Sequence, residues 1–365
     1  MPVRKIGVEE ELMLVDPASG RLIDVSGHAV LANEGETEVE HELFLPQIET
    51  STHPCEKADD LRAAIVAGRR AVGQSAAAAG ARAVAMPTPL LAGTESKITP
   101  KSRYRRIEEE YGALARLGLV CAMHVHVDVK DDDEGVAVID GIRPWLPLLV
   151  AISANSPYFQ GVDTGHASWR SQLWGRWPAA GTGQPFGDVA QYRAVCRRMI
   201  EWGGALDEGM LYFDARLSPR YPTVEVRVAD VCTDVEDAVL TALLVRALVT
   251  TVASGGEETP EASLNRRGDL LRVAGWRASR YGLEGDLVHP VDGSLRPVRE
   301  VFEATVDFTR EALEEAGDLD LVTESFEHLL ASGNGSTRQR SVFESTGDLA
   351  RVVDDIACRT EESWT

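Results

Sequence analysis

The segment that decides the fold is Gly7-Val8-Glu9-Glu10-Glu11-Leu12-Met13-Leu14. Its apolar residues, apart from Met13, fall at even-numbered positions, which is typical of a β-strand with one buried face. Glu9 and Glu11 share the other face, because side chains two positions apart on a strand point the same way. Two carboxylates held so close repel each other unless a cation lies between them, and Mg²⁺ prefers oxygen ligands. The segment therefore predicts a strand with a metal-binding face; the alternative is an edge strand with solvated carboxylates.

The composition limits the class of protein. The 365 residues are 44% hydrophobic and 26% charged, which suits a soluble globular chain with a buried core in one large domain or two ordinary ones. A formal net charge of −21 argues against nucleic acid or an anionic membrane surface as partners. It leaves room for nucleotides, which local arginines and metal ions can hold.

Three features predict a cytoplasmic protein without a membrane span. The five cysteines are scattered and form no C-x-x-C pair, which suits a reducing compartment. The first residues lack the long apolar segment of a secretory signal. The longest apolar run, residues 235–253, contains Glu236, Asp237 and Arg246, so we expect a buried helix there.

Residues 41–50 predict a second strand with a glutamate near each end. Glu42 and Glu49 are seven positions apart, so an unbroken strand would place them on opposite faces. Pro46 cannot donate to a strand ladder, and a bulge at that point would restore a shared face. The alternative is a pair of ordinary surface glutamates.

Two later strands carry further polar faces. Residues 119–129 alternate valine with His124, His126 and Asp128, which indicates a site on the concave side of a sheet. In residues 223–230 the valines face the core while Glu225 and Arg227 share the opposite face. These two form either an ion pair or a metal ligand beside a phosphate contact. Residues 211–217 predict another strand, with Tyr212, Asp214 and Arg216 on one face.

Several arginines are candidate anion contacts. The charged helix predicted over residues 101–118 contains Arg103, Arg105 and Arg106, which either pair with its glutamates or face a phosphate. The irregular stretch 156–187 is rich in tryptophan and predicts a binding loop in which Arg170 and Arg176 are available. The glycine-rich turn 333–340 carries Arg338 and Arg340; it either reaches nucleotide phosphates or connects two helices.

The rest of the chain predicts helices. They are expected from residue 59 or 60 to about 80, over 142–155 and 188–202, and through most of the chain from residue 235, ending with 348–359. No phosphate-binding loop, dinucleotide-binding fingerprint or hydrolase nucleophile motif is present in the sequence.

Taken in order, four motifs resemble one family. Val8-Glu9-Glu10-Glu11, the 42–50 segment ending Ile48-Glu49-Thr50, Met123-His124-Val125-His126-Val127 and Thr223-Val224-Glu225-Val226-Arg227 are similar to the carboxylate-amine ligases. More specifically, they resemble the type 2 glutamate–cysteine ligase group of the glutamine-synthetase-like superfamily. The resemblance extends over nearly the whole chain, although His166 and Trp169 stand where tyrosine-like residues are expected in the substrate loop.

The resemblance implies roles for individual residues. The metal ligands would be Glu9, Glu11, Glu42, Glu49, His124 and Glu225. Arg227 and Arg216 would be catalytic, and ATP would contact Arg227, Arg338 and Arg340. The amino-acid substrates would contact Arg170, Arg176, His126 and Trp169.

The resemblance also implies the fold and the reaction. We expect an α+β protein whose curved, mainly antiparallel sheet forms a funnel-shaped half-barrel, with helices on its outer face. Residues 1–365 would form one domain, strand-rich to about residue 232 and mainly helical over 233–365. ATP and Mg²⁺, or Mn²⁺ in its place, would serve to join L-glutamate to L-cysteine through an acyl phosphate. Small molecules would be the partners, and relatives suggest a homo-oligomer.

Three alternatives stay open at this point. One is the same chemistry on another acid and amine. Another is a metal-dependent hydrolase that uses His124 and His126 as a zinc pair, although carboxylates outnumber histidines among the candidate ligands. The third is a nucleotide-binding or scaffold protein without catalysis.

Overall fold

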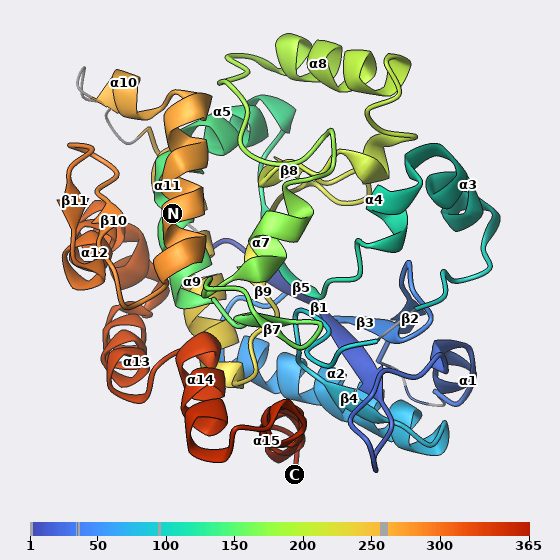
Figure 1. The fold of residues 1–365 in the computed structure, drawn as a ribbon. Helices are drawn as coiled ribbons and strands as arrows, with labels where there is room; N and C mark the ends of the chain where they lie inside the picture. Colours follow the sequence, from blue (N-terminus) through green and yellow to red (C-terminus); the bar gives the residue numbers. More distant parts are fainter. Residues whose placement is uncertain (1–2, 34, 36, 94–95, 256–261) are drawn as a thin grey trace.

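A seven-stranded sheet is the centre of the fold (Figure 1). The computed structural model describes residues 3–33, 35, 37–93, 96–255 and 262–365. The strands lie in the order β2-β3-β1-β5-β9-β8, β4 also pairs with β1, and every pairing is antiparallel. Their bounds are β1 Ile6–Val15, β2 Val39–His41, β3 Gln47–Ser51, β4 Arg82–Val84, β5 Ala122–Asp128, β8 Ala215–Leu217 and β9 Thr223–Asp230. The predicted α+β class with a mainly antiparallel sheet is confirmed; the half-barrel shape stays a prediction.

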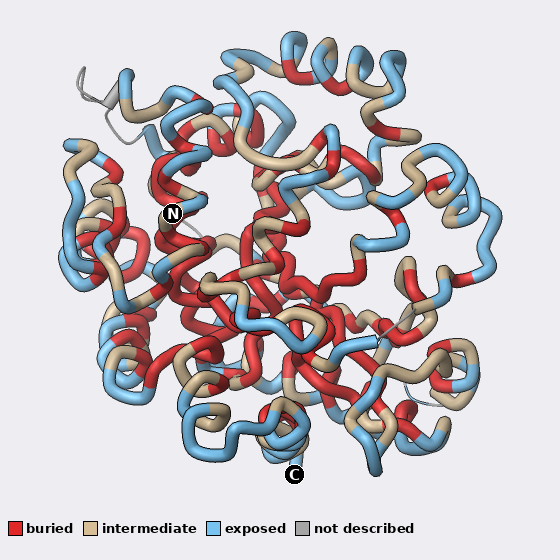
Figure 2. Tube along the Cα trace, in the orientation of Figure 1, coloured by how far each residue is buried: buried red, intermediate tan, exposed pale blue. Residues whose placement is uncertain are grey.

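One face of the sheet is covered by helices. Helix α2 (Ala58–Ala78) packs on β1, β3 and β4, and α9 (Val235–Ala253) packs on β1, β5 and β9. Val8 of β1 and Val125 of β5 belong to the same buried cluster as α9. In Figure 2 the strands at the centre of the molecule are coloured as buried. The apolar side chains that alternate along β1 and β5 thus form the part of the core that packs against these helices.

The other elements surround this core. The helices are α1 Ser26–Leu31, α3 Ser102–Tyr111, α4 Ala113–Arg116, α5 Asp132–Ile142, α6 Leu146–Ile152, α7 Trp169–Trp174, α8 Val189–Glu201, α10 Ala262–Asn265, α11 Gly268–Tyr281, α12 Val298–Ala316, α13 Leu319–Ser332, α14 Gly335–Thr346 and α15 Leu349–Glu362. Two 3₁₀ turns, η1 Arg143–Trp145 and η2 Glu208–Met210, and two small hairpins, β6 Tyr158–Phe159 with β7 Val162–Asp163 and β10 Leu287–Val288 with β11 Leu295–Arg296, complete the list.

The long apolar helices belong to the core. The buried helix predicted over residues 235–253 is α9, which is packed between the sheet and α5, α12 and α13. The stretch Asp132–Ile152 is long and apolar enough to cross a membrane by composition, but 89% of it is buried inside the protein. Its apolar surface is therefore already covered by the rest of the chain.

The prediction of one continuous strand over residues 41–50 is wrong, although residues 47–50 do belong to a strand, β3. The chain reverses at Leu45-Pro46, so β2 and β3 are two arms of a hairpin in which Glu40 pairs with Glu49. The turn is closed by the Gln47 N–H, which donates 3.0 Å to the Phe44 carbonyl. Glu42 lies in this turn and reaches the same place as Glu49 by reversal of the chain, without the expected bulge.

Three other predicted boundaries also change. The helix over residues 101–118 is broken at Gly112, whose φ of 55° is readily adopted only by glycine, into α3 and α4. The strand over 211–217 shrinks to β8, because Phe213 forms only an isolated bridge with Gly181. The predicted turn over 333–340 is the start of α14, where the Asn334 side chain caps the N–H of Thr337.

Candidate active site

Polar side chains cross the sheet in register on the face opposite α2 and α9. Glu11 pairs with Glu49, and Glu9 pairs with His124 on the other neighbour of β1. His126 pairs with Glu225 on β9, which in turn pairs with Arg216 on β8. Because strand residues in register share a face, these side chains meet without any help from loops.

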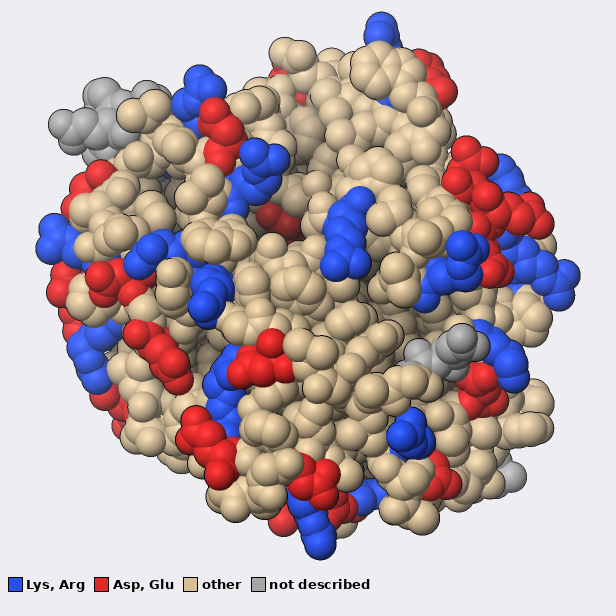
Figure 3. Space-filling model, viewed as in Figure 1, with Lys and Arg blue, Asp and Glu red and all other residues tan. Residues whose placement is uncertain are grey.

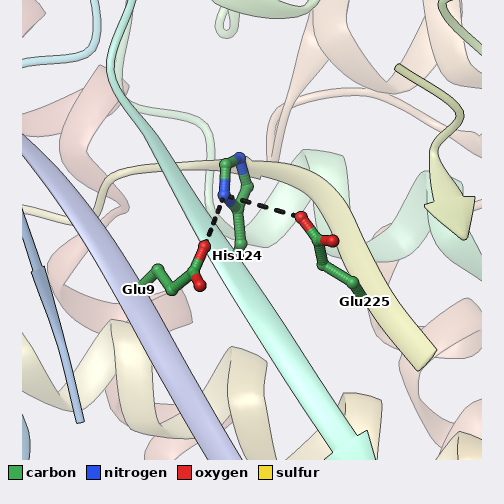
Figure 4. A group of neighbouring side chains, drawn as sticks. All are labelled: Glu9, His124 and Glu225. Carbon is green, nitrogen blue, oxygen red and sulfur yellow. Dashed lines mark hydrogen bonds and ion pairs between the residues drawn. The ribbon is translucent and has the colours of Figure 1, made fainter. Parts of the chain in front are cut away.

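Glu9, His124 and Glu225 form the first cluster, with one residue from each of three adjacent strands (Figure 4). Their potential ligand atoms all lie within 4.8 Å of one another. His124 Nδ1 is 3.3 Å from Glu9 Oε2 and 3.9 Å from Glu225 Oε1. His126 stands beside them: its Nε2 is 3.3 Å from Glu9 Oε1 and its Nδ1 is 2.9 Å from Thr223 Oγ1.

Charges and burial set the protonation of the first cluster. Burial would raise the pKa of Glu9, but hydrogen bonds from His124 and His126 outweigh it and leave the pKa below the usual value. Burial likewise opposes ionisation of Glu225, and the charges of Arg227 and Arg216 lower its pKa in spite of it. Burial and the charge of Arg227 lower the pKa of His124 to about 4. At pH 7 this cluster therefore presents two carboxylates and a neutral imidazole.

Glu11, Glu42 and Glu49 form the second cluster, and their carboxylate oxygens also lie within 4.8 Å of one another. Burial, followed by repulsion from Glu42, raises the pKa of Glu11 to about 8. Burial and the charges of Glu42, Glu9 and Glu11 raise the pKa of Glu49 well above its usual value. In the described part of the chain no lysine or arginine forms an ion pair with any of these three residues. Three carboxylates that lie this close together without an ion-paired lysine or arginine would be stabilised by a bound cation.

Both clusters fit a hard divalent ion. Their donors are carboxylate oxygens with one imidazole, which suits Mg²⁺ or Mn²⁺ better than the nitrogen and sulfur sets of zinc sites. His124 Nε2 is buried and has no hydrogen-bond partner within the described residues. The structure brings together all six residues that the sequence nominated as metal ligands. Their role as ligands stays a prediction.

Two arginines and two aromatic rings stand beside the first cluster. Arg216 Nε lies 2.7 Å from Glu225 Oε2, and Arg227 pairs with the other oxygen of the same carboxylate. The Arg227 guanidinium lies 5.5 Å from the Trp174 ring centre and 5.9 Å from that of Tyr212. Arg227 Nε is buried and makes no hydrogen bond to any described residue. One donor of this arginine is therefore left for an anion.

The clusters and both arginines line one cavity of about 480 Å³. At its rim Arg103 of α3 and Asp207 form an ion pair, with Arg103 Nε 2.7 Å from Asp207 Oδ2. Arg105 and Arg106 are exposed, which agrees with the alternative that the arginines of this helix do not face a phosphate. On the face of the molecule seen in Figure 3, acidic and basic side chains are interspersed around the periphery.

Three predicted substrate contacts lie outside this cavity. Arg170 is buried behind β9 and donates to the backbone carbonyls of Arg227, at 3.0 Å, and of Val228, at 3.3 Å. The Trp169 ring packs against that of His166, with centres 5.1 Å apart, and Arg176 is exposed. Arg170 thus supports the strand that carries Arg227, and direct contact of these three residues with substrate stays a prediction.

The two predicted ATP contacts on α14 also lie apart from the carboxylates. Arg338 pairs with Asp234, at 2.8 Å, and with Asp237. Arg340 pairs with Asp163, at 2.6 Å, and lines a second cavity of about 510 Å³ with Arg280. The structure does not bring these arginines to Arg227, and their contact with ATP stays a prediction.

Asp230 organises the site and was missed in the sequence. This buried carboxylate accepts hydrogen bonds from the Ser156 and Ser168 hydroxyls and from the Asn155 N–H, at 2.7 to 2.9 Å. It therefore anchors both ends of the 155–168 loop to the end of β9. A signal was available, because Asp230 shares the core-facing parity of the β9 valines, and a carboxylate in that position must find donors.

Comparison with solved structures identifies the fold. A glutamate–cysteine ligase from Francisella tularensis in complex with AMP matches with a TM-score of 0.69 and 16% identity, over 100% of this chain and 90% of that chain. A bifunctional glutathione synthetase from Pasteurella multocida matches with a TM-score of 0.71 and 14% identity, over 99% of this chain and 53% of that chain. The chain shares the fold of these two ligases. That the protein is itself an ATP-dependent ligase that forms a carbon–nitrogen bond rests on its family and its sequence relatives.

Sequence comparison narrows the class to one family. The model of glutamate-cysteine ligase family 2 matches residues 5–355, and the chain belongs to that family. A relative from Nocardioides sp., provisionally named glutamate–cysteine ligase 2-1, is 49% identical over 99% of this chain and 97% of its own length. A relative from Streptomyces coelicolor, provisionally named glutamate–cysteine ligase 2, is 45% identical over 98% of this chain and 99% of its own length.

Proposed function

We propose that this protein joins L-glutamate to L-cysteine with ATP, giving γ-glutamylcysteine, ADP and phosphate. The observation that carries the proposal is the pair of acidic clusters, which face one cavity beside Arg227. The names of the relatives from Nocardioides sp. and Streptomyces coelicolor support the choice of substrates.

The metal is proposed to be Mg²⁺, with Mn²⁺ as the alternative. Glu9, His124 and Glu225 would hold one ion, and Glu11, Glu42 and Glu49 would hold another. Bound ions of this kind neutralise charge on the ATP phosphates while the γ-phosphoryl group moves to a carboxylate.

The protein's own groups would stabilise and shield the reacting atoms. The fixed charges of Arg227 and Arg216 lie where negative charge spreads over the transferring phosphoryl group. Transfer turns the substrate carboxylate into an acyl phosphate; the amine then attacks the acyl carbon, phosphate leaves, and the amine loses a proton. Trp174 and Tyr212 wall the cavity with apolar surface, which limits attack of water on the acyl phosphate.

A trapping experiment tests this chemistry. With ATP, Mg²⁺ and L-glutamate, hydroxylamine in place of L-cysteine should intercept the acyl phosphate as a hydroxamate, and ADP should be released with it. Glu9→Gln should abolish both signals. Glu109→Gln, which changes an exposed glutamate on α3, is the matched control and should leave both unchanged. Equal hydroxamate formation by Glu9→Gln and the parent would refute the proposal.

The same assay addresses the alternatives. Replacing L-glutamate and L-cysteine in turn by other amino acids identifies a different acid or amine if ADP is released faster with it. A zinc hydrolase is not supported by the family or the relatives. In addition, both histidines of the predicted zinc pair lie 3.3 Å from the same carboxylate, that of Glu9.

We further propose that residues 1–365 act as one catalytic domain and work in the cytoplasm, with a homo-oligomer as the expected assembly. All strands of the main sheet lie between residues 6 and 230, and the chain after residue 235 is mainly helical, which supports the proposed division near residue 232. Sedimentation of the purified protein tests the assembly.

A further inference from the structure

Exposed apolar side chains are concentrated on one part of the surface. Of the thirteen large apolar residues that are exposed in the described part of the chain, seven lie between residues 264 and 295. They come from α10, α11 and the β10–β11 hairpin, and they include Leu270, Val273 and Trp276, which are 44–54% exposed. A concentration of exposed apolar side chains is the usual mark of an interaction site.

These elements form one continuous surface, the exposed side of residues 264–295, which we call the α11 face. The hairpin packs against α11, and its loop is tied to α10 by the Asn265 side-chain amide, which donates 3.0 Å to the Val291 carbonyl. Along α11, Leu270 and Val273 are separated by one helical turn, so they share one solvent-facing stripe. The stripe has no covering element among the described residues.

The α11 face carries positive charge in an acidic protein. The formal net charge of the chain is −21, yet α11 contains Arg272, Arg277 and Arg280 against a single acidic residue. Arg277 and Arg280 donate to backbone carbonyls, and none of the three arginines forms an ion pair with a described residue. A partner that fits this face therefore combines apolar surface with negative charge.

A surface with that combination lies on α12 and α13. Residues 298–332 contain ten acidic residues against two arginines. A groove of about 560 Å³ between the two helices is lined by the apolar side chains of Phe302 and Val306. The exposed carboxylates of Glu303 and Glu324 also line this α12–α13 groove. Neither forms an ion pair within the described residues, since the two arginines of these helices pair with other acids.

The α11 face and the α12–α13 groove lie side by side on one chain. The β10–β11 hairpin separates them and contacts both α11 and α12 (Figure 1). Both surfaces are exposed, so neither covers the other. A second copy rotated by 180° about an axis between them would bring the α11 face of each chain to the groove of the other. This is the arrangement of a two-fold dimer, in which every contact occurs twice.

We propose that the α11 face and the α12–α13 groove form a dimer interface, with a second copy of this chain as the partner. The inference rests on the proposed function only for the homo-oligomer, whose contact surface it names. It is independent of the ligase reaction, because all residues of both carboxylate clusters come from one chain.

Sedimentation velocity over a range of protein concentrations measures the dissociation constant of the dimer. The parent should sediment at twice the mass of one chain. Val273→Asp should raise the dissociation constant at least about 10-fold, because the new carboxylate would lose its hydration and face other carboxylates. Val162→Asp is the matched control, because Val162 is an exposed valine on β7, outside both surfaces, and it should leave the constant unchanged.

An exchange of charge tests the reciprocal arrangement. Arg272→Glu and Glu324→Arg should each weaken the dimer, because each places like charges across the interface twice. An equimolar mixture of the two variants should dimerise more tightly than either alone, since both halves of the mixed interface again join opposite charges. Circular dichroism like that of the parent shows that these changes at exposed positions leave the fold intact.

The outcomes separate this inference from the proposed reaction. The interface is overturned if the parent sediments as a single chain at every concentration, if Val273→Asp dimerises like the parent, or if the two charge variants dimerise no better when mixed. Each of these results leaves the ligase proposal standing, because that proposal depends on hydroxamate formation. If the parent dimerises as expected but forms no hydroxamate, the proposed reaction fails and the interface stands.

Discussion

Replacing Arg69 should be among the most destabilising single changes in this protein. Arg69 lies on α2 with 0% of its surface exposed, and its guanidinium donates to Glu10 at 2.9 and 2.5 Å. It also donates at 2.7 Å to each of the carbonyls of Cys232 and Thr233, directly after β9. One side chain thus ties β1 to the end of β9 behind β5, on the face opposite the active site.

The size of the effect follows from what Arg69→Met leaves behind. Glu10 is only 2% exposed, so its carboxylate would stay buried without a cation, and two backbone carbonyls would lose their donor. Breaking a buried ion pair by removing one partner costs about 3–5 kcal/mol, against a total stability of about 5–15 kcal/mol. Removing both charges leaves no buried charge, so Arg69→Met with Glu10→Leu should cost much less than the sum of the two single changes.

Urea unfolding at pH 7, followed by tryptophan fluorescence and circular dichroism, measures these costs. Arg70→Met is the matched control, because Arg70 is the exposed neighbour whose one hydrogen-bond acceptor among the described residues is the Trp364 carbonyl, and it should cost less than about 0.5 kcal/mol. A cost below about 1 kcal/mol for Arg69→Met, or a double variant that costs the full sum, would refute the reasoning. Variants that fold should also need more Mg²⁺ for half-maximal ADP release, because Glu10 lies between Glu9 and Glu11.

Three more outcomes are expected. Glu49→Gln should raise the metal-free unfolding free energy by on the order of 1 kcal/mol, because it removes a carboxylic acid whose ionisation is opposed in the folded state by burial and by the neighbouring carboxylates, while weakening Mg²⁺ binding; a loss of metal-free stability would contradict this. Because the pKa of Glu11 is raised to about 8, Mg²⁺ must displace its proton at neutral pH, so affinity should rise as pH increases towards 8 and calorimetry should detect proton release. Gly335→Ala should cost about 1–3 kcal/mol in chemical unfolding, since its Cβ would collide with the Asn155 side chain; Gly275→Ala, which meets nothing within 4 Å, should cost nothing.

Alternation within single strands was the part of the site that the sequence could predict. Glu9, Glu11, His124 and Glu225 come from strands whose two-residue period is a local property, so their shared face follows from β1, β5 and β9 alone. The α+β class was what the family resemblance of the motifs on these strands implied.

Contacts between distant segments could not be predicted in this way. Glu42 reaches its cluster because the chain reverses at Leu45-Pro46, whereas the sequence predicted one strand with a bulge there. Arg338 and Arg340 were expected at ATP, but their carboxylate partners Asp234 and Asp163 are about 100 and 177 positions away in the chain. A charged side chain alone does not reveal which distant carboxylate it meets.

The three successive glutamates of β1 make the protein sensitive to the deletion of a single residue in this strand. Glu9, Glu10 and Glu11 have identical side chains but different neighbours. Glu10 accepts a hydrogen bond from Arg69, whereas Glu9 and Glu11 line the cavity. An in-frame loss of one glutamate codon would hardly alter composition or charge, and a carboxylate would still be available to each environment. It would, however, turn every residue on one side of the deletion to the opposite face of the sheet, and so disrupt the pairing of Glu9 with His124 or of Glu11 with Glu49. The register of this strand is therefore fixed by the flanking apolar residues Val8 and Leu12 and not by the three glutamates.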